Sequence, residues 1–587
     1  MTTLDYRNIN SLWASIIVET FSRLGLKTAV TCPGSRSTPL TVALARHPKI
    51  DVVPILDERS AAFFALGCAK REHRPVAVVC TSGTAGANFY PAVIEAAMGK
   101  TPVIFLTADR PPELRDCSSG QTIDQQKLFG SFTNWYSELA LPKIDLLDYI
   151  RQTIIHAWHR TCFPQAGPVH LNCPFRDPLA PLPDCPMPLI DSSSFFATVS
   201  LYEPREPAAP EADSIAPLIK QWQTISQGII IAGPSSPRHP QQYCRAVAEV
   251  SQQLGWPILA DALSPLRNYQ QLNPLLISSY DILLRSRKIA DRLVPKVVLQ
   301  LEALPTSKVL RQWLKQNQVK RYILSQSYEN LDPIHGHTQA VYGSVLSLNH
   351  QIDAAKKAQA RLKDNSYSQQ WLGYEKNAQT WLETYLSEAD QCFEGKISRR
   401  LSTHLPADSQ LFISNSMPIR DMESFWQPNN SRIKTYFNRG ANGIDGILST
   451  AMGIAHGGKP TFLLTGDLAF LHDTNGLLSS SRLDGQLTIV VINNQGGGIF
   501  EMLPIANFNP PFENYFATPQ AVEISCLCKA YGIEHRAIGD CTELITQLRN
   551  SGSHSLVKGV KVWEICTDRK ADAAYRQSIT EKLEKSL

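Results

Sequence analysis

Short apolar runs that end in glycine or polar residues alternate along this chain with longer segments of helical periodicity. The pattern is clearest over 461–500, where one apolar run ends at Gly466-Asp467 and a second ends at Asn493-Asn494. The segment between the two runs is polar at both ends and has the spacing of a helix. This stretch therefore predicts a strand–helix–strand unit of the kind that builds parallel sheets.

The same alternation recurs in three blocks, so the chain is predicted to be an α/β protein with three doubly wound parallel-sheet domains. Strands are predicted at 28–31, 52–56, 76–80, 102–107 and 167–172, then at 228–232, 257–260, 296–301 and 321–324, and finally at 410–413, 435–437, 462–464 and 487–492. Composition divides the chain into a first domain at 1–185, a Ser- and Pro-rich linker at 186–211 and a central scaffold domain at 212–347. A helical connector at 348–395 and a third domain at 396–587 follow.

Composition argues against several classes of function. Charged residues make up 19% of the 587 residues and the formal net charge is +4, so no strong field favours nucleic acid or a membrane surface as a partner. No apolar run approaches the roughly 20 residues that span a bilayer, and the amphipathic N-terminus carries acidic residues, unlike a signal or transit peptide. The thirteen cysteines include no CxxC pair, which favours reduced thiols over a zinc site. The chain is expected to be cytoplasmic.

Oxygen-bearing side chains follow two strands of the predicted unit. Asp467 and Asn494 each come at a strand end, and carboxyl ends of parallel strands meet at one edge of a sheet. With a backbone carbonyl freed by Gly496, they form an oxygen-only ligand set that suits Mg²⁺ (or Mn²⁺) bound together with a phosphate group. Either dipeptide alone is also a common turn former. Their occurrence together at this spacing favours the metal site.

Five basic residues lie in loops at or near predicted strand ends, although the chain as a whole is almost neutral. They are Arg36, Arg110, Lys308, Arg420 and Arg439. Planar guanidinium groups at such points suit carboxylates. A solvated arginine in a turn, or a lysine that interacts with a helix dipole, is the alternative for any one of them. From the residues alone we expect an enzyme that acts on small polyanionic molecules.

The segment 461–500 resembles the diphosphate-binding motif of thiamine diphosphate enzymes, which opens with GD and closes with NN. Most of those families have glycine where this chain has Leu468. The GDL variant, together with PGSRSTPL at 33–40, TADRPPEL at 107–114 and NNQGGGIFEMLP at 493–504, is similar to the 2-succinyl-5-enolpyruvyl-6-hydroxy-3-cyclohexene-1-carboxylate synthase family. That resemblance implies thiamine diphosphate- and Mg²⁺-dependent decarboxylation of 2-oxoglutarate. It also implies conjugate addition of the succinyl-semialdehyde unit to isochorismate, in menaquinone or phylloquinone biosynthesis.

The resemblance also implies roles for individual residues. Glu58 would hydrogen-bond the aminopyrimidine ring of the cofactor and relay a proton, and Ile444 would hold the cofactor in its bent shape. The remaining cofactor contacts would come from Asn415, Gly466, Asp467, Leu468, Asn494, Ile499 and Phe500, with Asp467, Asn494 and Gly496 as metal ligands.

The two substrates would be bound by different groups. Ser416 and Arg420 would hold the distal carboxylate of 2-oxoglutarate, and Arg439 would serve the cofactor-bound intermediate. Isochorismate would be faced by Ser35, Arg36, Arg110 and Gln121, with help from Lys308. The family usually has asparagine before this glutamine, whereas this chain has Gly120. The catalytic set would then be Glu58, Arg36, Ser416, Arg420 and Arg439.

In thiamine diphosphate enzymes, the pyrimidine-binding domain (here 1–185) and the diphosphate-binding domain (here 396–587) usually meet across two subunits. The resemblance therefore implies a homodimer, with a tetramer of paired dimers as an extension. An acetolactate synthase-like enzyme or another 2-oxo acid decarboxylase would share the GD and NN elements but would not need PGSRSTPL. A non-catalytic scaffold relative would be expected to lack Glu58, Asp467 or Asn494, and all three are present.

Overall fold

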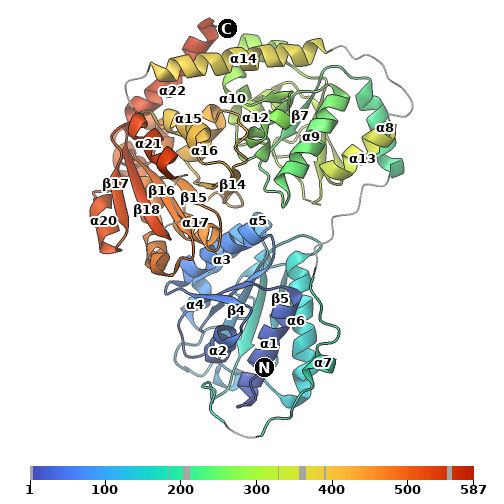
Figure 1. Cartoon of the computed structure of the whole chain (residues 1–587), viewed down its shortest axis with the longest axis vertical. Helices are drawn as coiled ribbons and strands as arrows, with labels where there is room; N and C mark the ends of the chain where they lie inside the picture. Colours follow the sequence, from blue (N-terminus) through green and yellow to red (C-terminus); the bar gives the residue numbers. More distant parts are fainter. Residues whose placement is uncertain are drawn as a thin grey trace.

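The computed structural model describes residues 4–183, 186–202, 212–327, 329–355, 365–388, 392–551 and 558–586. It contains three six-stranded sheets in which all strand pairs are parallel, with helices packed against the sheets (Figure 1). The prediction of three doubly wound α/β domains is confirmed. Parts of the predicted linker and connector, 203–211, 356–364 and 389–391, lie outside the described residues, and the domain boundaries remain predictions. Within the described residues no helix is both long enough and apolar enough to cross a membrane.

The first domain has a sheet with strand order β2-β1-β3-β4-β6-β5. Its strands are β1 (Thr28–Thr31), β2 (Asp51–Pro54), β3 (Val76–Cys80), β4 (Val103–Asp109), β5 (Trp135–Glu138) and β6 (Val169–Pro174). Its helices are α1 (Ile9–Leu24), α2 (Thr38–Arg46), α3 (Glu58–Glu72), α4 (Thr84–Asn88), α5 (Tyr90–Met98), α6 (Leu147–Cys162) and α7 (Ser192–Phe195). Local signals set the limits of α1, because the side chain of Asn8 accepts a hydrogen bond from Ser11 N and Gly25 ends the helix in the left-handed region at φ 115°.

The central domain has the strand order β12-β11-β10-β7-β8-β9. Its strands are β7 (Gly228–Ala232), β8 (Ile258–Ala260), β9 (Leu276–Ile277), β10 (Val297–Leu301), β11 (Lys320–Ser325) and β12 (Thr338–Tyr342). Its helices are α8 (Ala212–Gln223), α9 (Pro240–Leu254), α10 (Tyr280–Leu283), α11 (Arg287–Arg292), α12 (Lys308–Gln316) and α13 (Val345–Ala355). The inner strand β7 is buried along its whole length, which explains its continuous apolar sequence GIIIA.

The third domain has the strand order β14-β13-β15-β16-β18-β17. Its strands are β13 (Gln410–Ile413), β14 (Lys434–Phe437), β15 (Thr461–Gly466), β16 (Gln486–Asn493), β17 (Glu534–Ala537) and β18 (Gly559–Cys566). Its helices are α15 (Glu394–His404), α16 (Met417–Phe425), α17 (Ile447–Ala455), α18 (Asp467–His472), α19 (Gly498–Glu501), α20 (Ile524–Ala530), α21 (Cys541–Ser551) and α22 (Arg569–Ser586). The chain order reverses between β13 and β15, which is where ligands bind in open parallel sheets.

A long helix, α14 (Ser366–Ser387), runs along the top of the central and third domains (Figure 1). Trp371 in its first half packs into the core of the central domain. Leu382 and Leu386 in its second half pack with Phe393 and with Ile579 of α22. This helix therefore joins the two domains through buried apolar contacts.

The first and third domains share one continuous hydrophobic core, in which α3 lies against α17 (Figure 1). Two glycines allow this close approach. A Cβ on Gly67 would lie 2.1 Å from the carbonyl oxygen of Thr450, and a Cβ on Gly453 would lie 2.0 Å from that of Phe64. The backbones of the two helices are thus in direct contact, and the two domains are fixed to each other.

Two predicted elements differ in the structure. The segment 468–486 was expected to form one helix, but α18 ends at His472 and a 3₁₀ segment follows it. The break comes at Asp473, whose buried carboxylate accepts hydrogen bonds from the backbone N–H and the hydroxyl of Ser449, at 2.7 and 3.1 Å. The predicted strand 52–56 ends early as β2, and Leu56 is 66% exposed.

Candidate active site

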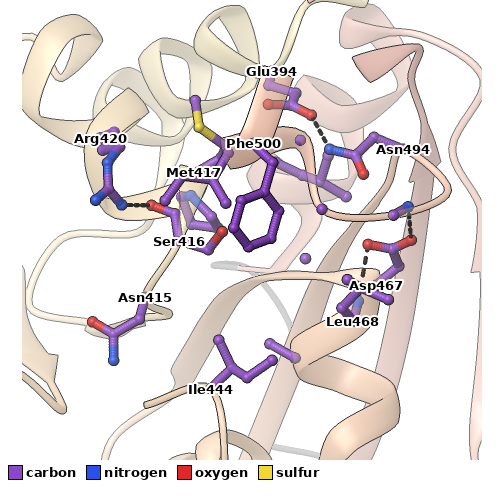
Figure 2. Close-up of a pocket in the computed structure, with 18 of the residues that line it drawn as sticks. Glu394, Asn415, Ser416, Met417, Arg420, Ile444, Asp467, Leu468, Asn494 and Phe500 are labelled. Carbon is purple, nitrogen blue, oxygen red and sulfur yellow. Dashed lines mark hydrogen bonds between the residues drawn. The ribbon is translucent and has the colours of Figure 1, made fainter. Parts of the chain in front are cut away.

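Four adjacent strands of the third sheet, β14, β13, β15 and β16, end at one cavity of about 270 Å³ (Figure 2). Every residue that lines it lies between Glu394 and Phe500. The cavity brings together the predicted residues Asn415, Ser416, Arg420, Arg439, Ile444, Gly466, Asp467, Leu468, Asn494, Gly496, Ile499 and Phe500. Positions far apart in the sequence therefore meet because their strands are neighbours.

Asp467 is the first residue of α18 and is only 5% exposed. Its carboxylate accepts hydrogen bonds from the backbone N–H of Leu468 at 2.9 Å and of Gly496 at 2.8 Å (Figure 2). Burial raises the pKa of Asp467 to about 6, against the effect of these two hydrogen bonds. A cation in the cavity would compensate the buried charge and favour the ionised form.

Asn494 follows β16, directly across from Asp467. Its Nδ2 donates a hydrogen bond of 2.6 Å to Oε1 of Glu394, and its Oδ1 is buried without a hydrogen-bond partner among the described residues. Figure 2 shows that the oxygen end of the amide faces the side of the cavity on which Asp467 lies. An unpartnered buried oxygen beside a buried carboxylate fits a hard cation.

The loop after Asn494 requires glycine. Gly496 has φ 137°, and a Cβ there would lie 2.4 Å from the carbonyl oxygen of Ala517. Its own carbonyl accepts a hydrogen bond from Gly498 N at 3.0 Å and retains a second lone pair. The three oxygen donors predicted as metal ligands thus come from one edge of the sheet and fit a magnesium ion.

Arg420 and Arg439 supply positive charge to the same cavity. Burial lowers the pKa of both guanidinium groups, and the charge of Arg439 lowers the pKa of Arg420 further. Among the described residues, no carboxylate lies within 4.0 Å of either group; Arg439 donates to Oδ1 of Asn415 at 2.9 Å and Arg420 donates to the carbonyl of Ser416. Two half-buried cations without a carboxylate partner suit an anionic ligand.

Ser416 precedes α16 with φ 75°, which is unusual for a residue other than glycine. This backbone strain occurs in the lining of the cavity, where the Ser416 carbonyl accepts a hydrogen bond from Arg420. Apolar side chains line the same cavity: Ile444 lies below it and the ring of Phe500 points into it (Figure 2). The cavity therefore combines ionic and apolar groups.

The first domain carries a second group of predicted residues. Arg110 donates to the carbonyl of Gln121 at 2.8 Å and to the hydroxyl of Ser82, and Gln121 donates to the carbonyl of Ser82 at 3.0 Å. Arg36 donates to the carbonyl of Phe175 at 3.0 Å. Burial and the nearby charge of Arg36 lower the pKa of Arg110. No carboxylate of the described chain lies within 4.0 Å of these two arginines, which again suits an anion.

The structure does not bring all predicted residues into one cavity. Glu58 begins α3 after β2, and Ser35 is exposed in the loop after β1. Lys308 is the first residue of α12 in the central domain and is also exposed. None of these three side chains lines the cavity of the third domain. Their roles remain predictions.

Sequence reasoning missed several residues at this site. Glu394 lines the cavity and holds Asn494, yet in the sequence it is a lone glutamate at a helix start. Glu95, from the first domain, accepts hydrogen bonds from the backbone of the loop that carries Arg439. No local sequence signal identifies either residue, because both act through contacts between distant segments.

Known proteins are similar to this chain over all three of its domains. The chain matches family models for the thiamine pyrophosphate enzyme N-terminal binding domain over 13–128, the middle domain over 206–413 and the C-terminal binding domain over 422–558. Its fold is similar to the crystal structure of benzoylformate decarboxylase from Polynucleobacter necessarius, with a TM-score of 0.71 and 17% identity over 95% of this chain and 98% of that chain. The fold and the domain matches define a thiamine diphosphate enzyme.

Curated relatives with higher sequence identity identify the family within this class. The chain is 52% identical over 583 residues to 2-succinyl-5-enolpyruvyl-6-hydroxy-3-cyclohexene-1-carboxylate synthase of Trichodesmium erythraeum, covering 98% of both chains. It is 51% identical over 579 residues to the synthase of Gloeothece citriformis, with 98% of each covered, and 49% identical to that of Acaryochloris marina over the full length of both. The chain belongs to the 2-succinyl-5-enolpyruvyl-6-hydroxy-3-cyclohexene-1-carboxylate synthase family.

Proposed function

We propose that this chain decarboxylates 2-oxoglutarate and adds the succinyl-semialdehyde unit to isochorismate, in a reaction that depends on thiamine diphosphate and Mg²⁺. Membership of the family supports this activity, within menaquinone or phylloquinone biosynthesis. The structural observation that carries it is the meeting of Asp467, Asn494 and two arginines in one cavity, the arginines having no carboxylate within 4.0 Å among the described residues. We place the enzyme in the cytoplasm.

The third domain would hold the cofactor. In this proposal Asp467, Asn494 and the carbonyl of Gly496 would hold Mg²⁺, or Mn²⁺ in its place, whose charge would neutralise that of the diphosphate. When bound, thiamine diphosphate supplies the electron sink that allows a 2-oxo acid to lose carbon dioxide. Ile444 supports the cofactor from below, and Ile499 and Phe500 exclude water from the reacting carbon.

The arginines would bind the substrates. Arg420, held by the carbonyl of Ser416, binds the distal carboxylate of 2-oxoglutarate, and Arg439 lies beside it. On the first domain, Arg36 and Arg110 bind the carboxylates of isochorismate. Around them Gln121, Ser35 and Lys308 complete the second-substrate site; Gly120, where the family usually has asparagine, contributes no side-chain hydrogen bond.

Glu58 would hold a proton at its carboxyl group and share it with the aminopyrimidine ring. Among the described residues, none from the first domain lines the cavity of the third domain, so Glu58 and Asp467 of one chain do not line a common site. We therefore propose a homodimer in which Glu58 of one copy faces Asp467 of the other, with a tetramer as a pair of such dimers.

Product analysis tests the activity. The purified chain is incubated with thiamine diphosphate, Mg²⁺ and 2-oxoglutarate, with and without isochorismate, and the products are identified by mass spectrometry. We expect the 2-succinyl cyclohexene carboxylate product only when both substrates are present, whereas carbon dioxide release from 2-oxoglutarate should not require isochorismate. A product formed from two 2-oxo acids would instead indicate an acetolactate synthase-like enzyme.

Complementation tests the shared site. Glu58→Gln and Asp467→Ala should each abolish activity, and a mixture whose subunits have exchanged should regain about a quarter of wild-type activity. The reason is that half of the dimers are then mixed and each mixed dimer has one intact site. No recovery after proven subunit exchange would contradict a site built by two copies.

A further inference from the structure

Glu394 is a buried carboxylate at the first turn of α15, only 1% exposed, and it contacts Asn494 rather than the solvent. Its Oε1 accepts the 2.6 Å hydrogen bond from Asn494 Nδ2, and Thr567 donates to the same oxygen at 3.4 Å. Its Oε2 is paired with Arg576 of α22. Both carboxylate oxygens therefore have fixed partners.

The carboxylate decides which way the amide of Asn494 points. An ionised carboxylate only accepts hydrogen bonds, so it can face the NH₂ end of an amide but repels the oxygen end. With Nδ2 held by Glu394, Oδ1 has to face the cavity, where it is buried and without a protein partner. The amide is therefore presented as an oxygen ligand before any cation binds.

A distant helix keeps Glu394 in place. Arg576 also pairs with Asp421 of α16, donating from Nε at 2.9 Å and from Nη2 at 2.8 Å. Its guanidinium lies over the ring of Phe393, 5.1 Å from the centroid. The C-terminal helix thus anchors α15 and α16 together, and with them the residue that orients Asn494.

We infer that Glu394 is the positioning residue that preorganises Asn494 for the metal, and that Arg576 of the C-terminal helix holds Glu394 in that position. The inference rests on the proposed function, which makes Asn494 a metal ligand. The oxygens of Glu394 contact Asn494, Thr567 and Arg576, so the inference gives Glu394 the orientation of the amide and leaves the cation to Asp467, Asn494 and Gly496. Outer partners of this kind typically change metal affinity about 10- to 100-fold.

Binding of Mn²⁺ in the presence of thiamine diphosphate, followed by electron paramagnetic resonance, tests this without reference to turnover. We expect Glu394→Ala to weaken Mn²⁺ binding about 10- to 100-fold. Glu394→Gln should bind distinctly more tightly than Glu394→Ala, because its amide oxygen still accepts from Asn494. If Glu394→Ala does not fold, Glu394→Met fills the same volume without an acceptor and should show the same loss.

The matched control is Asp421→Asn, which alters the same Arg576 network but has no contact with Asn494. It should leave Mn²⁺ affinity nearly unchanged. Equal affinities for Glu394→Ala and Asp421→Asn, with Asp467→Ala still defective, would overturn the positioning role alone. Normal binding by Asp467→Ala would overturn the metal site itself, and the role of Glu394 with it.

A second, independent observation concerns two thiols. Sγ of Cys392, just before α15, lies 3.3 Å from Sγ of Cys541, the first residue of α21. The hydrogen bond from Cys392 lowers the pKa of Cys541, and the nearby charges of Lys396 and Arg400 act in the same direction. A disulfide needs the sulfurs at about 2.05 Å, so a small movement of two thiols already in contact would suffice.

We propose that Cys392 and Cys541 form a reversible disulfide by exchange with a small-molecule disulfide such as oxidised glutathione. One protein thiolate attacks the external disulfide and releases a thiolate, and the second protein thiolate then displaces the other half. Two protein thiols are oxidised, one external disulfide is reduced to two thiols, and the two protons pass to the released thiolates. The bond would fasten the start of α15 to α21.

Peptide mass spectrometry of the holoenzyme treated with oxidised glutathione tests this. We expect a loss of two hydrogens in a linked Cys392–Cys541 peptide pair, reversed by dithiothreitol and absent in Cys392→Ser. Cys117→Ser, which removes an exposed thiol elsewhere, should leave the linkage intact. A stable glutathione adduct on Cys392 without the internal bond, or no reaction, would overturn the proposal.

Discussion

The carboxylate of Glu95 in the first domain accepts a hydrogen bond of 2.7 Å from the backbone N–H of Ala441 in the third domain. The neighbouring N–H of Gly440 donates to the other oxygen at 3.0 Å, and Lys70 lies 3.8 Å away. Glu95 is only 3% exposed. The loop that carries Arg439 into the cavity is therefore held by a buried charge from another domain.

Replacement of Glu95 should loosen this loop. Glu95→Ala leaves two backbone N–H groups and the Lys70 ammonium buried with fewer partners, which should cost about 3 kcal/mol of stability. It should also raise the KM for 2-oxoglutarate, because Arg439 loses its support. Glu95→Gln, which retains one acceptor, should lose less in thermal unfolding and steady-state kinetics. Unchanged melting temperature and KM in Glu95→Ala would show that the loop is held by other contacts.

Two helical glycines should respond in opposite directions to alanine. Gly67→Ala places a methyl group 2.1 Å from the carbonyl oxygen of Thr450 and should destabilise the protein by about 1–3 kcal/mol, because α3 and α17 must separate. Gly373 lies on the exposed face of α14, and a Cβ added there would have no neighbouring side chain or distant backbone atom within 4 Å. Gly373→Ala should therefore stabilise the protein by about 0.5–1 kcal/mol. Thermal unfolding measures both; a shift of the same sign in the two variants would contradict this packing.

Stability should depend on pH through Glu423. Burial raises the pKa of Glu423 to about 8, from 4.5, and the charge of Asp261 adds to the effect. The folded state therefore keeps a proton that the unfolded state releases, so the stabilisation is complete below pH about 4.5 and is lost as the pH rises to about 8. Relative to Glu423→Gln, the wild-type melting temperature should fall between pH 5 and 8. If the difference in melting temperature between wild type and Glu423→Gln does not change with pH, Glu423 is not protonated in the folded state.

Replacing an arginine of the third domain and replacing one of the first domain should impair different stages of the reaction. Arg420→Ala should lower kcat/KM for 2-oxoglutarate by about 10- to 150-fold, since a hydrogen bond to a charged group contributes about 1.5–3 kcal/mol. Arg110→Ala should lower kcat/KM for isochorismate by a similar factor and leave carbon dioxide release from 2-oxoglutarate nearly unchanged. Single-turnover measurements with and without isochorismate separate these effects. The assignment would be reversed if Arg110→Ala impaired carbon dioxide release as strongly as Arg420→Ala.

The sequence alone predicted the inner strands well and the edges poorly. Inner strands such as β3 and β7 are buried along their whole length, so they appear as continuous apolar runs with sharp ends. The edge strands β5, β9, β12 and β17 were not predicted, and most residues of β5, β12 and β17 are partly or fully exposed. The inner strand β18, whose first three residues are partly exposed, was also missed. An edge strand has one neighbour and little apolar burial, so its pattern is weak.

The residues of the cavity were predictable because their chemistry is local. Asp467, Asn494 and Arg420 each follow a strand, and parallel strands bring their carboxyl ends to one edge of the sheet whatever the rest of the chain does. The GDL and NNQGGGIFEMLP motifs lie in these same loops, and PGSRSTPL and TADRPPEL lie at strand ends of the first domain, so the class of enzyme and its family were also determined by sequence.

The contacts that hold these groups in place form between segments that are far apart in the sequence. Glu394 meets Asn494 across 100 residues, Arg576 meets Glu394 across 182, and Glu95 meets Ala441 across 346. A buried carboxylate needs hydrogen-bond donors, and here the donors come from distant segments rather than from neighbours in the sequence. The partner of such a carboxylate is therefore known only once the helices have packed. The sequence thus determined which groups carry out the chemistry, and packing between distant segments determined how those groups are oriented.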